Sequence, residues 1–217
     1  MLKRSFDVIA TALVMPVLLP VMGVIALLIR VRMGRPILFR QERLGRGGER
    51  FKLVKFRTMS DGRGPDGELL PDDERLAALG RRLRSTSLDE LPEFFHVLAG
   101  TMSLVGPRPL PAVYENAYSS HHWRRHEVRP GITGLAQVTG RNDVTWENRL
   151  NTDVEYVETH TIWLDLQILA RTVRTIVKRE GISAEGHATM PSLLQDPAAD
   201  IDGTTDPEAG GDTPVTG

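Results

Sequence analysis

The chain has 217 residues, no cysteine, 41% hydrophobic and 25% charged residues, and a formal net charge of -1. A chain of this length can bury a core without staples, and the absence of cysteine excludes disulfides, thiolate metal sites and cysteine nucleophiles. The charge is uneven: residues 1–180 hold 27 Lys and Arg against 21 Asp and Glu (+6), whereas residues 181–217 hold none against 7 (-7). We expect the basic part to carry the function and residues 187–217 to form an acidic, disordered tail.

A membrane segment is predicted near the N-terminus. The stretch from residue 8 to residue 29 lies between Asp7 and Arg30 and carries no charge. At about 1.5 Å per residue it is long enough to cross a hydrocarbon core of about 30 Å. The first 57 residues also hold 12 Lys and Arg against 3 acidic residues, a local charge of +9 that favours an anionic surface or ligand.

Three arrangements of this segment are open. A cleaved signal peptide is disfavoured because no small-x-small cleavage site follows. A straight span meets two difficulties: Pro16 and Pro20 lie inside it, and both flanks are basic, which by the positive-inside rule places both on the cytoplasmic face. A re-entrant helix that bends at Pro16 and Pro20 and returns to the same face accounts for both observations. We expect this arrangement for residues 1–35.

A β-hairpin and a long loop are predicted next. Alternating apolar residues in 37–41 and 51–56 flank a glycine-rich turn, which is typical of a hairpin, and Lys55 and Arg57 lie at its end. The polar stretch 60–74 is rich in Gly, Pro and Asp and predicts a long surface loop.

An amphipathic helix is predicted near the end of the basic part. Arg171, Arg174 and Lys178 lie on one face, and Trp163 lies at the start. This composition suits the headgroup boundary of a membrane, and packing on a protein core is the alternative. The apolar positions, spaced by four and three, are Ile162, Leu166, Leu169, Val173 and Ile176.

The segment 87–92, Ser-Leu-Asp-Glu-Leu-Pro, has two structural interpretations. Ser87 and Glu90 fit a capping box, which would give the carboxylates a purely structural place at a helix start. Pro92 instead suits the first position of a helix, which would leave the acidic pair just outside it. In either case the helix dipole is expected to lower the pKa of the carboxylates and to keep them ionised.

The same segment has a catalytic interpretation. A carboxylate pair near Arg84 and Lys55 is what a phosphoryl-transfer site needs, because a nucleophile must stay anionic while cations gather the charge of the substrate. Adjacent acids can also divide the work, so that one attacks and the other holds a metal ion. Asp89 and Glu90 are therefore candidate catalytic and metal-binding residues.

Two further stretches are candidates for phosphate binding. Arg108 lies between two prolines that restrict the backbone, so its guanidinium would be held rigidly for bidentate contact with phosphate; a plain proline turn is the alternative. Residues 129–142 form a glycine-rich stretch with donors that suit a phosphate or nucleotide. The candidates within it are Arg129, Gly131, Thr133, Gln137 and Arg141.

These motifs follow one another in a fixed order: Lys3-Arg4-Ser5-Phe6-Asp7, Gln41-x-Arg43-x-Gly45, Lys55-Phe56-Arg57-Thr58-Met59, Ser87-Leu88-Asp89-Glu90-Leu91-Pro92, Met102-Ser103-Leu104-Val105-Gly106-Pro107-Arg108-Pro109, Arg129-Pro130-Gly131-Ile132-Thr133-Gly134 and Asp153-x-x-Tyr156-Val157. As a set they resemble the bacterial sugar transferases, which are monotopic polyprenol-phosphate phosphoglycosyl transferases. The resemblance runs from residue 3 to about residue 190, and the short chain is similar to the minimal members of the family.

The resemblance implies an α+β, mostly helical fold with a re-entrant N-terminal membrane helix, interfacial amphipathic helices and a small β-hairpin. Residues 1–35 would form the membrane helix, and residues 36–186 would form a cytosolic and interfacial catalytic domain. The protein would be monotopic, on the cytosolic face of the bacterial cytoplasmic membrane.

The resemblance also implies a reaction. A sugar 1-phosphate would pass from a UDP-sugar to undecaprenyl phosphate with release of UMP, and Mg²⁺ would be required. Asp89 would attack the β-phosphate and form a covalent phosphosugar intermediate, Glu90 would be its partner, and one or both would bind Mg²⁺. The residues from 129 to 142 would lie at the nucleotide end. The phosphate-binding cations would be Lys55, Arg57, Arg84 and Arg108.

The chain departs from the family pattern at three places. The family's helix-breaking Ser-Pro aligns with Leu19-Pro20, so the proline is kept and the serine is not. His96 stands where the family usually has Asn, and Thr101 where it usually has Asp. Neither residue is expected to touch the carboxylate pair.

The expected partners are a UDP-sugar, undecaprenyl phosphate and membrane lipids, with no nucleic acid; a homo-oligomer is left open. An N-acetylated amino sugar is favoured over galactose or glucose. One rival is direct transfer without a covalent intermediate, in which Asp89 only binds metal. Another is a non-catalytic membrane-anchored module that holds anionic lipid, and it is disfavoured because lipid binding needs neither the acidic pair nor a proline-flanked arginine.

Overall fold

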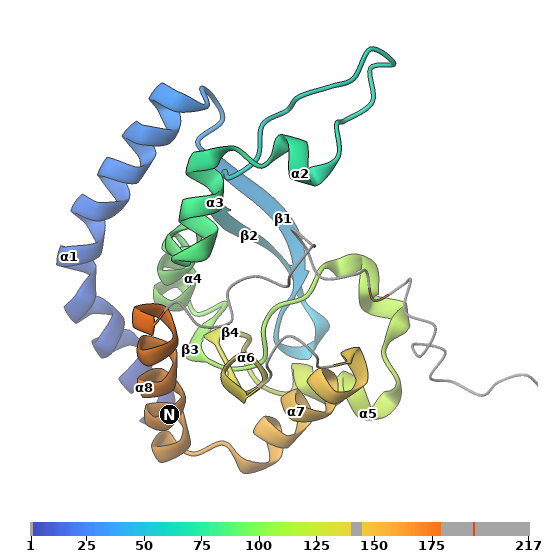
Figure 1. Ribbon diagram of the computed structural model, residues 1–217. Coiled ribbons are helices and arrows are strands. Elements are labelled where there is room, and N and C mark those ends of the chain that lie inside the picture. Colours follow the sequence, from blue (N-terminus) through green and yellow to red (C-terminus); the bar gives the residue numbers. More distant parts are fainter. Residues whose placement is uncertain (1, 140–144, 179–192, 194–217) are drawn as a thin grey trace, which may run out of the picture.

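A computed structural model describes residues 2–139, 145–178 and 193 (Figure 1). Within this part of the chain, helices surround a two-stranded antiparallel sheet, β1–β2, and a two-stranded parallel sheet, β3–β4. The expected α+β, mostly helical fold is confirmed. The helices are α1 (Leu2–Arg32), α2 (Asp72–Arg75), α3 (Ala78–Ser85), α4 (Glu93–Ala99), α5 (Ser120–Trp123), α6 (Leu135–Thr139), α7 (Trp146–Thr159) and α8 (Ile162–Lys178). The strands are β1 (Leu38–Leu44), β2 (Arg50–Phe56), β3 (Ser103–Val105) and β4 (Gly131–Thr133), and the 3₁₀ turns are η1 (Arg46–Gly48), η2 (Leu88–Glu90), η3 (Ala112–Ala117) and η4 (Arg124–His126).

The β-hairpin has the predicted form. β1 and β2 pair antiparallel from Leu38 opposite Phe56 to Leu44 opposite Arg50. Arg43 lies opposite Phe51, and Lys55 is four positions after Phe51 on β2, so Arg43 and Lys55 extend from the same face of the hairpin. The hairpin therefore presents two cations toward one side of the molecule.

The loop after the hairpin also agrees with the sequence. It projects from the body of the molecule in Figure 1, and Met59 pairs with Leu76 at its base. The short helix α2 near its end was not predicted. Its four residues are too few to show a hydrophobic period in the sequence.

The glycine-rich stretch from residue 129 differs from the prediction. Its described part is not a phosphate-cradling loop: it forms β4, which runs parallel to β3, followed by α6. A Cβ atom at Gly131 would lie 2.1 Å from the Gly106 backbone nitrogen, and one at Gly134 would lie 2.3 Å from the Gly106 carbonyl oxygen. The glycines allow two backbones to approach closely, which is a packing role that composition cannot distinguish from phosphate binding.

Helix α1 runs without interruption from Leu2 to Arg32, so the predicted break at Pro16 and Pro20 is wrong. Each proline removes only one backbone donor, and the two are four residues apart, so both losses fall on one side of the helix. The rest of the hydrogen-bond ladder holds, and α1 is bowed in Figure 1 instead of broken.

Both ends of α1 contact the same body of the protein. Near the N-terminus, Arg4 donates to the carbonyl oxygens of Val97 (2.6 Å) and Leu98 (3.0 Å) at the end of α4. Near the other end, Ile25 and Ile29 are buried in a cluster with Phe56 and Leu83, and the intervening inner face is buried as well. The opposite face is apolar and exposed, with Ile9, Leu13, Val14, Val17, Leu19, Val21, Val24, Leu27, Leu28 and Val31.

A buried carboxylate ties α1 to the parallel sheet. Asp7 accepts hydrogen bonds from the Ser103 hydroxyl (2.7 Å) and the Leu104 backbone N–H (3.3 Å). One turn earlier, Lys3 forms an ion pair of 2.6 Å with Asp165 of α8. Lys3 and Asp7, which precede the apolar segment, therefore contact other segments of the protein.

Helix α8 is confirmed as amphipathic, and much of its predicted apolar face is exposed. Leu166, Val173 and Ile176 from the predicted apolar face are exposed, as is Trp163, whereas Ile168 is fully buried. Leu166, Val173 and Ile176 therefore do not pack on a protein core within the described residues, whereas Leu169 does; the position at a headgroup boundary stays a prediction.

Most of the predicted acidic tail lies outside the described residues. Its one described residue, Leu193, is fully buried against Leu110, Trp146 and Leu150. The prediction of a disordered tail from residue 187 is therefore wrong at this position, where a single leucine reaches an apolar cluster.

Candidate functional site

The acidic pair lies in the short turn η2, directly before α4. Ser87 has a φ of +53° and its side chain caps no helix, so the capping box does not form. α4 begins at Glu93 after Pro92, which confirms the second interpretation. The acidic pair therefore lies between α3 and α4, and neither carboxylate serves as a helix cap.

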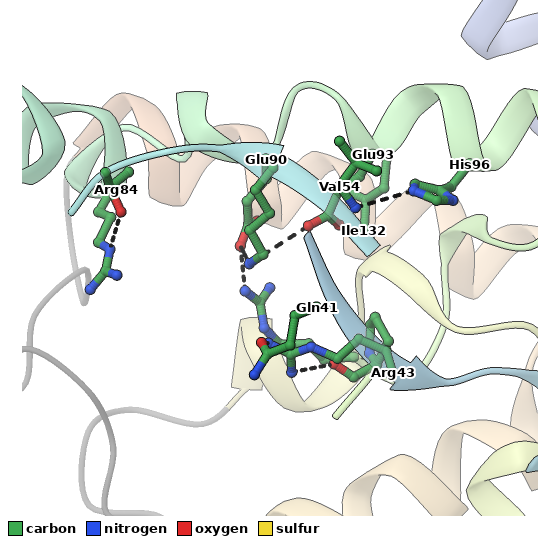
Figure 2. A network of polar contacts seen from close by, with 12 residues as sticks. Gln41, Arg43, Val54, Arg84, Glu90, Glu93, His96 and Ile132 are labelled. Atoms are coloured by element: carbon green, nitrogen blue, oxygen red, sulfur yellow. Dashed lines mark hydrogen bonds and ion pairs between the residues drawn. The ribbon is translucent and has the colours of Figure 1, made fainter. Parts of the chain in front are cut away.

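Glu90 is the centre of an ion-pair network (Figure 2). Its Oε1 accepts hydrogen bonds from Lys55 Nζ (3.3 Å) and from the Arg108 guanidinium. Burial alone would raise the pKa of Glu90, but the charges of Arg108 and Lys55 outweigh it and hold the pKa well below its usual value. The Glu90 charge in turn raises the pKa of Arg108. Glu90 is thus a permanently ionised anchor for two cations.

Asp89 is buried and has a different environment. Within the described part of the chain, no hydrogen bond or ion pair engages its carboxylate. Burial, and then the charge of Glu90, raise the pKa of Asp89, while Lys55, Arg108 and Arg84 oppose the increase. The expectation that the helix dipole lowers this pKa is therefore wrong, because desolvation and a like charge outweigh it. The result is a carboxylate without a partner beside three cations.

Glu93 is a third carboxylate that the sequence reasoning missed. It is 2% exposed, its Oε1 has no hydrogen-bond partner among the described residues, and Lys55 Nζ lies 3.7 Å away. Burial and the charge of Glu90 raise its pKa to about 7. In the sequence, Glu93 lies three residues after Glu90 and four residues after Asp89. This spacing places all three acids on one side of consecutive turns and could have indicated Glu93.

Replacing Glu93 with glutamine is expected to stabilise the protein at pH 8 but hardly at pH 5. Because the folded-state pKa of about 7 exceeds the ordinary glutamate value of 4.5, ionisation costs stability as pH rises through this interval. The gain at pH 8 should be on the order of 1–3 kcal/mol, visible as a higher melting temperature in detergent. The exposed control Glu147→Gln should melt like the wild type at both pH values, and equal gains for Glu93→Gln at pH 5 and pH 8 would contradict the assignment.

A buried scaffold holds the backbone of Arg108. Arg125 donates to Asp153 Oδ2 (3.1 and 2.7 Å) and to the Arg108 carbonyl oxygen (2.7 Å). The Tyr156 hydroxyl lies within hydrogen-bond distance of two acceptors, Asp165 Oδ1 (2.6 Å) and the Val105 carbonyl oxygen (3.1 Å). The Asp153-x-x-Tyr156 motif therefore positions the segment that carries Arg108, and the plain proline turn is the weaker interpretation.

The structure separates the other predicted phosphate ligands. Arg84 is close enough to Asp89 for its charge to act on that carboxylate, and its Nε donates to the Thr58 hydroxyl (3.0 Å). Arg57 instead donates to the carbonyl oxygens of Met59 (2.8 Å) and Arg35 (2.9 Å) and pairs with Asp61. Arg57 therefore fastens the base of the long loop, and its guanidinium is committed to protein acceptors.

The candidates from the glycine-rich stretch are also engaged elsewhere. Arg129 donates to the Gly100 carbonyl oxygen (2.7 Å), the Thr133 hydroxyl contacts that of Thr172 (2.7 Å), and the Gln137 amide donates to the Ile132 carbonyl oxygen (3.2 Å). None of these contacts reaches the acidic pair. Arg141 lies outside the described residues.

Arg43 is a further cation that the candidate set did not include. It donates to the Pro109 carbonyl (3.0 Å) and to Gln41 Oε1 (2.6 Å), and its buried Nε has no partner among the described residues (Figure 2). Burial, and then repulsion by Arg108, lower its pKa to about 10. Its position in the Gln41-x-Arg43 motif could have indicated this residue from the sequence.

His96 and Thr101, the two departures from the family pattern on and after α4, contact each other. His96 Nδ1 lies 3.1 Å from the Thr101 hydroxyl, and Nε2 accepts from the Val54 backbone N–H at 3.2 Å. The His96 ring faces Val54 of β2 (Figure 2). These contacts agree with the expectation that neither His96 nor Thr101 touches the acidic pair.

The donor set fits a magnesium ion only together with a substrate. Among the described residues, no cluster of three or more His, Asp or Glu could hold a metal alone. Mg²⁺ is commonly held by one or two carboxylates plus substrate phosphates. The unengaged oxygens of Asp89, next to Glu90, meet this requirement.

Comparison with known proteins identifies the family. The family model described as "Bacterial sugar transferase" matches residues 1–179. The chain belongs to the bacterial sugar transferase family. The resemblance drawn from the motifs is thereby confirmed, and the chain is an enzyme of the transferase class.

Similar curated proteins include several sugar transferases. EpsL of Bacillus subtilis, an uncharacterized sugar transferase, is 45% identical over 188 residues, covering 87% of this chain and 93% of that protein. The UDP-glucose:undecaprenyl-phosphate glucose-1-phosphate transferase of Caulobacter vibrioides is 40% identical over 185 residues, 81% of this chain and 69% of that protein. A UDP-N-acetylgalactosamine-undecaprenyl-phosphate N-acetylgalactosaminephosphotransferase of Aeromonas hydrophila is 34% identical, and the match spans 44% of its length.

Proposed function

We propose that this sugar transferase moves a sugar 1-phosphate from a UDP-sugar to undecaprenyl phosphate and releases UMP. The observation that carries the proposal is the arrangement around Asp89: an unengaged buried carboxylate beside Glu90, with Lys55, Arg108 and Arg84 close enough to act on its charge. Cations gathered around a carboxylate suit a substrate with two phosphates, because they neutralise both the donor and the developing leaving group.

In the proposed reaction, Asp89 acts as a nucleophile. A carboxylate oxygen attacks the β-phosphorus of the UDP-sugar, the bond to the bridging oxygen breaks, and UMP leaves with that oxygen. An oxygen of undecaprenyl phosphate then attacks the same phosphorus, and the bond to Asp89 breaks, which regenerates the carboxylate. Glu90 keeps Lys55 and Arg108 in place through both steps.

Asp89 and Glu90 would hold Mg²⁺ together with the phosphates of the donor. The bound ion would supply charge neutralisation of the pyrophosphate. Arg108 and Lys55 contribute the same kind of stabilisation from the protein, at positions fixed before the substrate arrives.

The experiment that tests the function is a UMP-release assay with undecaprenyl phosphate and a panel of UDP-sugars. Release of UMP with at least one donor, dependent on the lipid phosphate, is expected. We keep the proposal of an N-acetylated amino sugar; the names of the similar proteins include glucose, galactose and N-acetylgalactosamine transferases and favour no single sugar. Release from UDP-glucose alone would contradict the amino-sugar proposal but not the reaction.

We further propose that the protein is monotopic on the cytosolic face of the bacterial cytoplasmic membrane. α1 is the one helix among the described residues that is long and apolar enough to cross a membrane. Its two ends contact one body of protein, which supports flanks on the same side, while its exposed apolar face and that of α8 would lie in the lipid.

Cysteine accessibility should place both flanks of α1 on the cytosolic side. The chain has no native cysteine, so Leu2→Cys and Arg32→Cys, both at exposed positions at the two ends of α1, give single reporters. A membrane-impermeant thiol reagent should label both in inverted vesicles and neither in intact spheroplasts, and Val17→Cys in the middle of the exposed face should react in neither. Labelling of the two flanks from opposite sides would rule out the monotopic arrangement.

A further inference from the structure

A cavity lies between α6 and α7, which are neighbours in Figure 1. Its volume is about 350 Å³, within the range of small-molecule sites. Leu135 and Ala136 of α6 supply an apolar wall. On α7, Asn148, Arg149, Thr152 and Glu155 supply an amide, a guanidinium, a hydroxyl and a carboxylate.

Thr139 of α6 adds one hydroxyl, and the other polar residues of the lining come from one side of α7. Residues 148, 152 and 155 are spaced by four and three, so they form one stripe along α7, with Arg149 beside it. The Thr152 hydroxyl donates to the Asn148 carbonyl (2.8 Å), which leaves its oxygen able to accept. Among the described residues, the Glu155 carboxylate takes part in no ion pair. An apolar wall facing such donors and acceptors suits a flat base and a ribose diol.

Arg149 places a positive charge at this cavity. Its guanidinium lies 5.5 Å from the centre of the Trp146 ring, and within residues 2–139 and 145–178 no carboxylate forms an ion pair with it. Burial, followed by the charge of Arg108, lowers the pKa of Arg149. Two arginines that repel each other across a short distance favour an anion between them.

The cavity is tied to the acidic pair by the backbone scaffold. Asp153 is one turn after Arg149 on α7 and binds Arg125, which donates to the Arg108 carbonyl oxygen. Arg108 in turn binds Glu90. The helix that lines the cavity is therefore connected, through Asp153 and Arg125, to the segment that carries Arg108.

We propose that the cavity between α6 and α7 binds the nucleoside of the donor, with Arg149 on the α-phosphate and Glu155 accepting from the ribose hydroxyls. This assignment rests on the proposed function and adds a location to it. It places the nucleotide end on α7, whereas the glycine-rich stretch contributes its α6 wall.

The test uses the full chain in detergent micelles, with UMP and uridine as probes. Glu155→Gln should weaken the binding of both by about tenfold in calorimetry, since a charged acceptor is replaced by a neutral amide oxygen that binds the hydroxyls more weakly. Arg149→Gln should weaken UMP by about tenfold and leave uridine nearly unchanged. Glu147→Gln, the same change at an exposed position of α7 outside the cavity, should bind like the wild type. The KM for the UDP-sugar should rise in parallel with the UMP dissociation constant, with a smaller effect on kcat.

Two failures can be told apart. If the wild type releases UMP from UDP-sugars but Glu155→Gln and Arg149→Gln leave both UMP binding and KM unchanged, the cavity assignment is overturned and the proposed function stands. If the wild type releases UMP from no UDP-sugar, the proposed function fails first. Glu155 is exposed, so its substitution tests the site without threatening the fold.

Discussion

Asp89→Asn is expected to reduce turnover by about 10³-fold or more and to abolish the covalent phosphosugar adduct, because the amide cannot attack phosphorus. The adduct would be detected by intact-protein mass spectrometry after mixing the wild type with a UDP-sugar without lipid acceptor. Its mass increase should equal one phosphosugar and should disappear on addition of undecaprenyl phosphate.

Stability provides the control for this variant. Since burial and Glu90 raise the pKa of Asp89, the folded state disfavours its charge, and a neutral asparagine should melt at the same temperature or higher at pH 8. A loss of activity without a loss of stability would then belong to the chemistry. Near-normal turnover in Asp89→Asn would favour the rival in which the carboxylate only binds metal.

Arg108→Lys is expected to lower kcat/KM by about 10²–10³-fold, although the charge is kept. A lysine cannot contact Glu90 and a substrate phosphate in the same fixed plane, and the proline-flanked backbone leaves no freedom to compensate. Steady-state kinetics with a saturating lipid acceptor measure the effect. The matched change Arg124→Lys, at an exposed ion pair with Glu158, should keep wild-type kinetics. Equal activity of Arg108→Lys and Arg124→Lys would show that charge alone suffices.

The sequence predicted the elements whose signal is local. The alternation around the hairpin, the uncharged stretch of α1 and the four-and-three spacing of α8 each depend on a single segment. The acidic pair could be proposed for the same reason, since Asp89 and Glu90 are adjacent. Lys55 was also expected near the pair, but its hydrogen bond to Glu90 was not predicted.

The errors occurred where tertiary contacts decide. The sequence of residues 129–134 has glycines that suit a phosphate loop, but a strand packed against Gly106 needs them equally. Arg57 looked like a ligand until its acceptors at Arg35 and Met59 were placed. Glu93 and Arg149 depend on burial by distant segments, and no local pattern reports burial of a charge.

The contacts of α1 have a consequence for how the enzyme is produced. Because Asp7 satisfies the Ser103 hydroxyl and Ile29 fills a cluster with Leu83, removal of the apolar helix would leave a polar group and an apolar surface unmatched inside the remaining chain. A soluble fragment obtained by truncation after Arg32 would therefore lack part of its own interior. The apolar helix is thus an integral part of the folded core, and a preparation with a complete site has to include it.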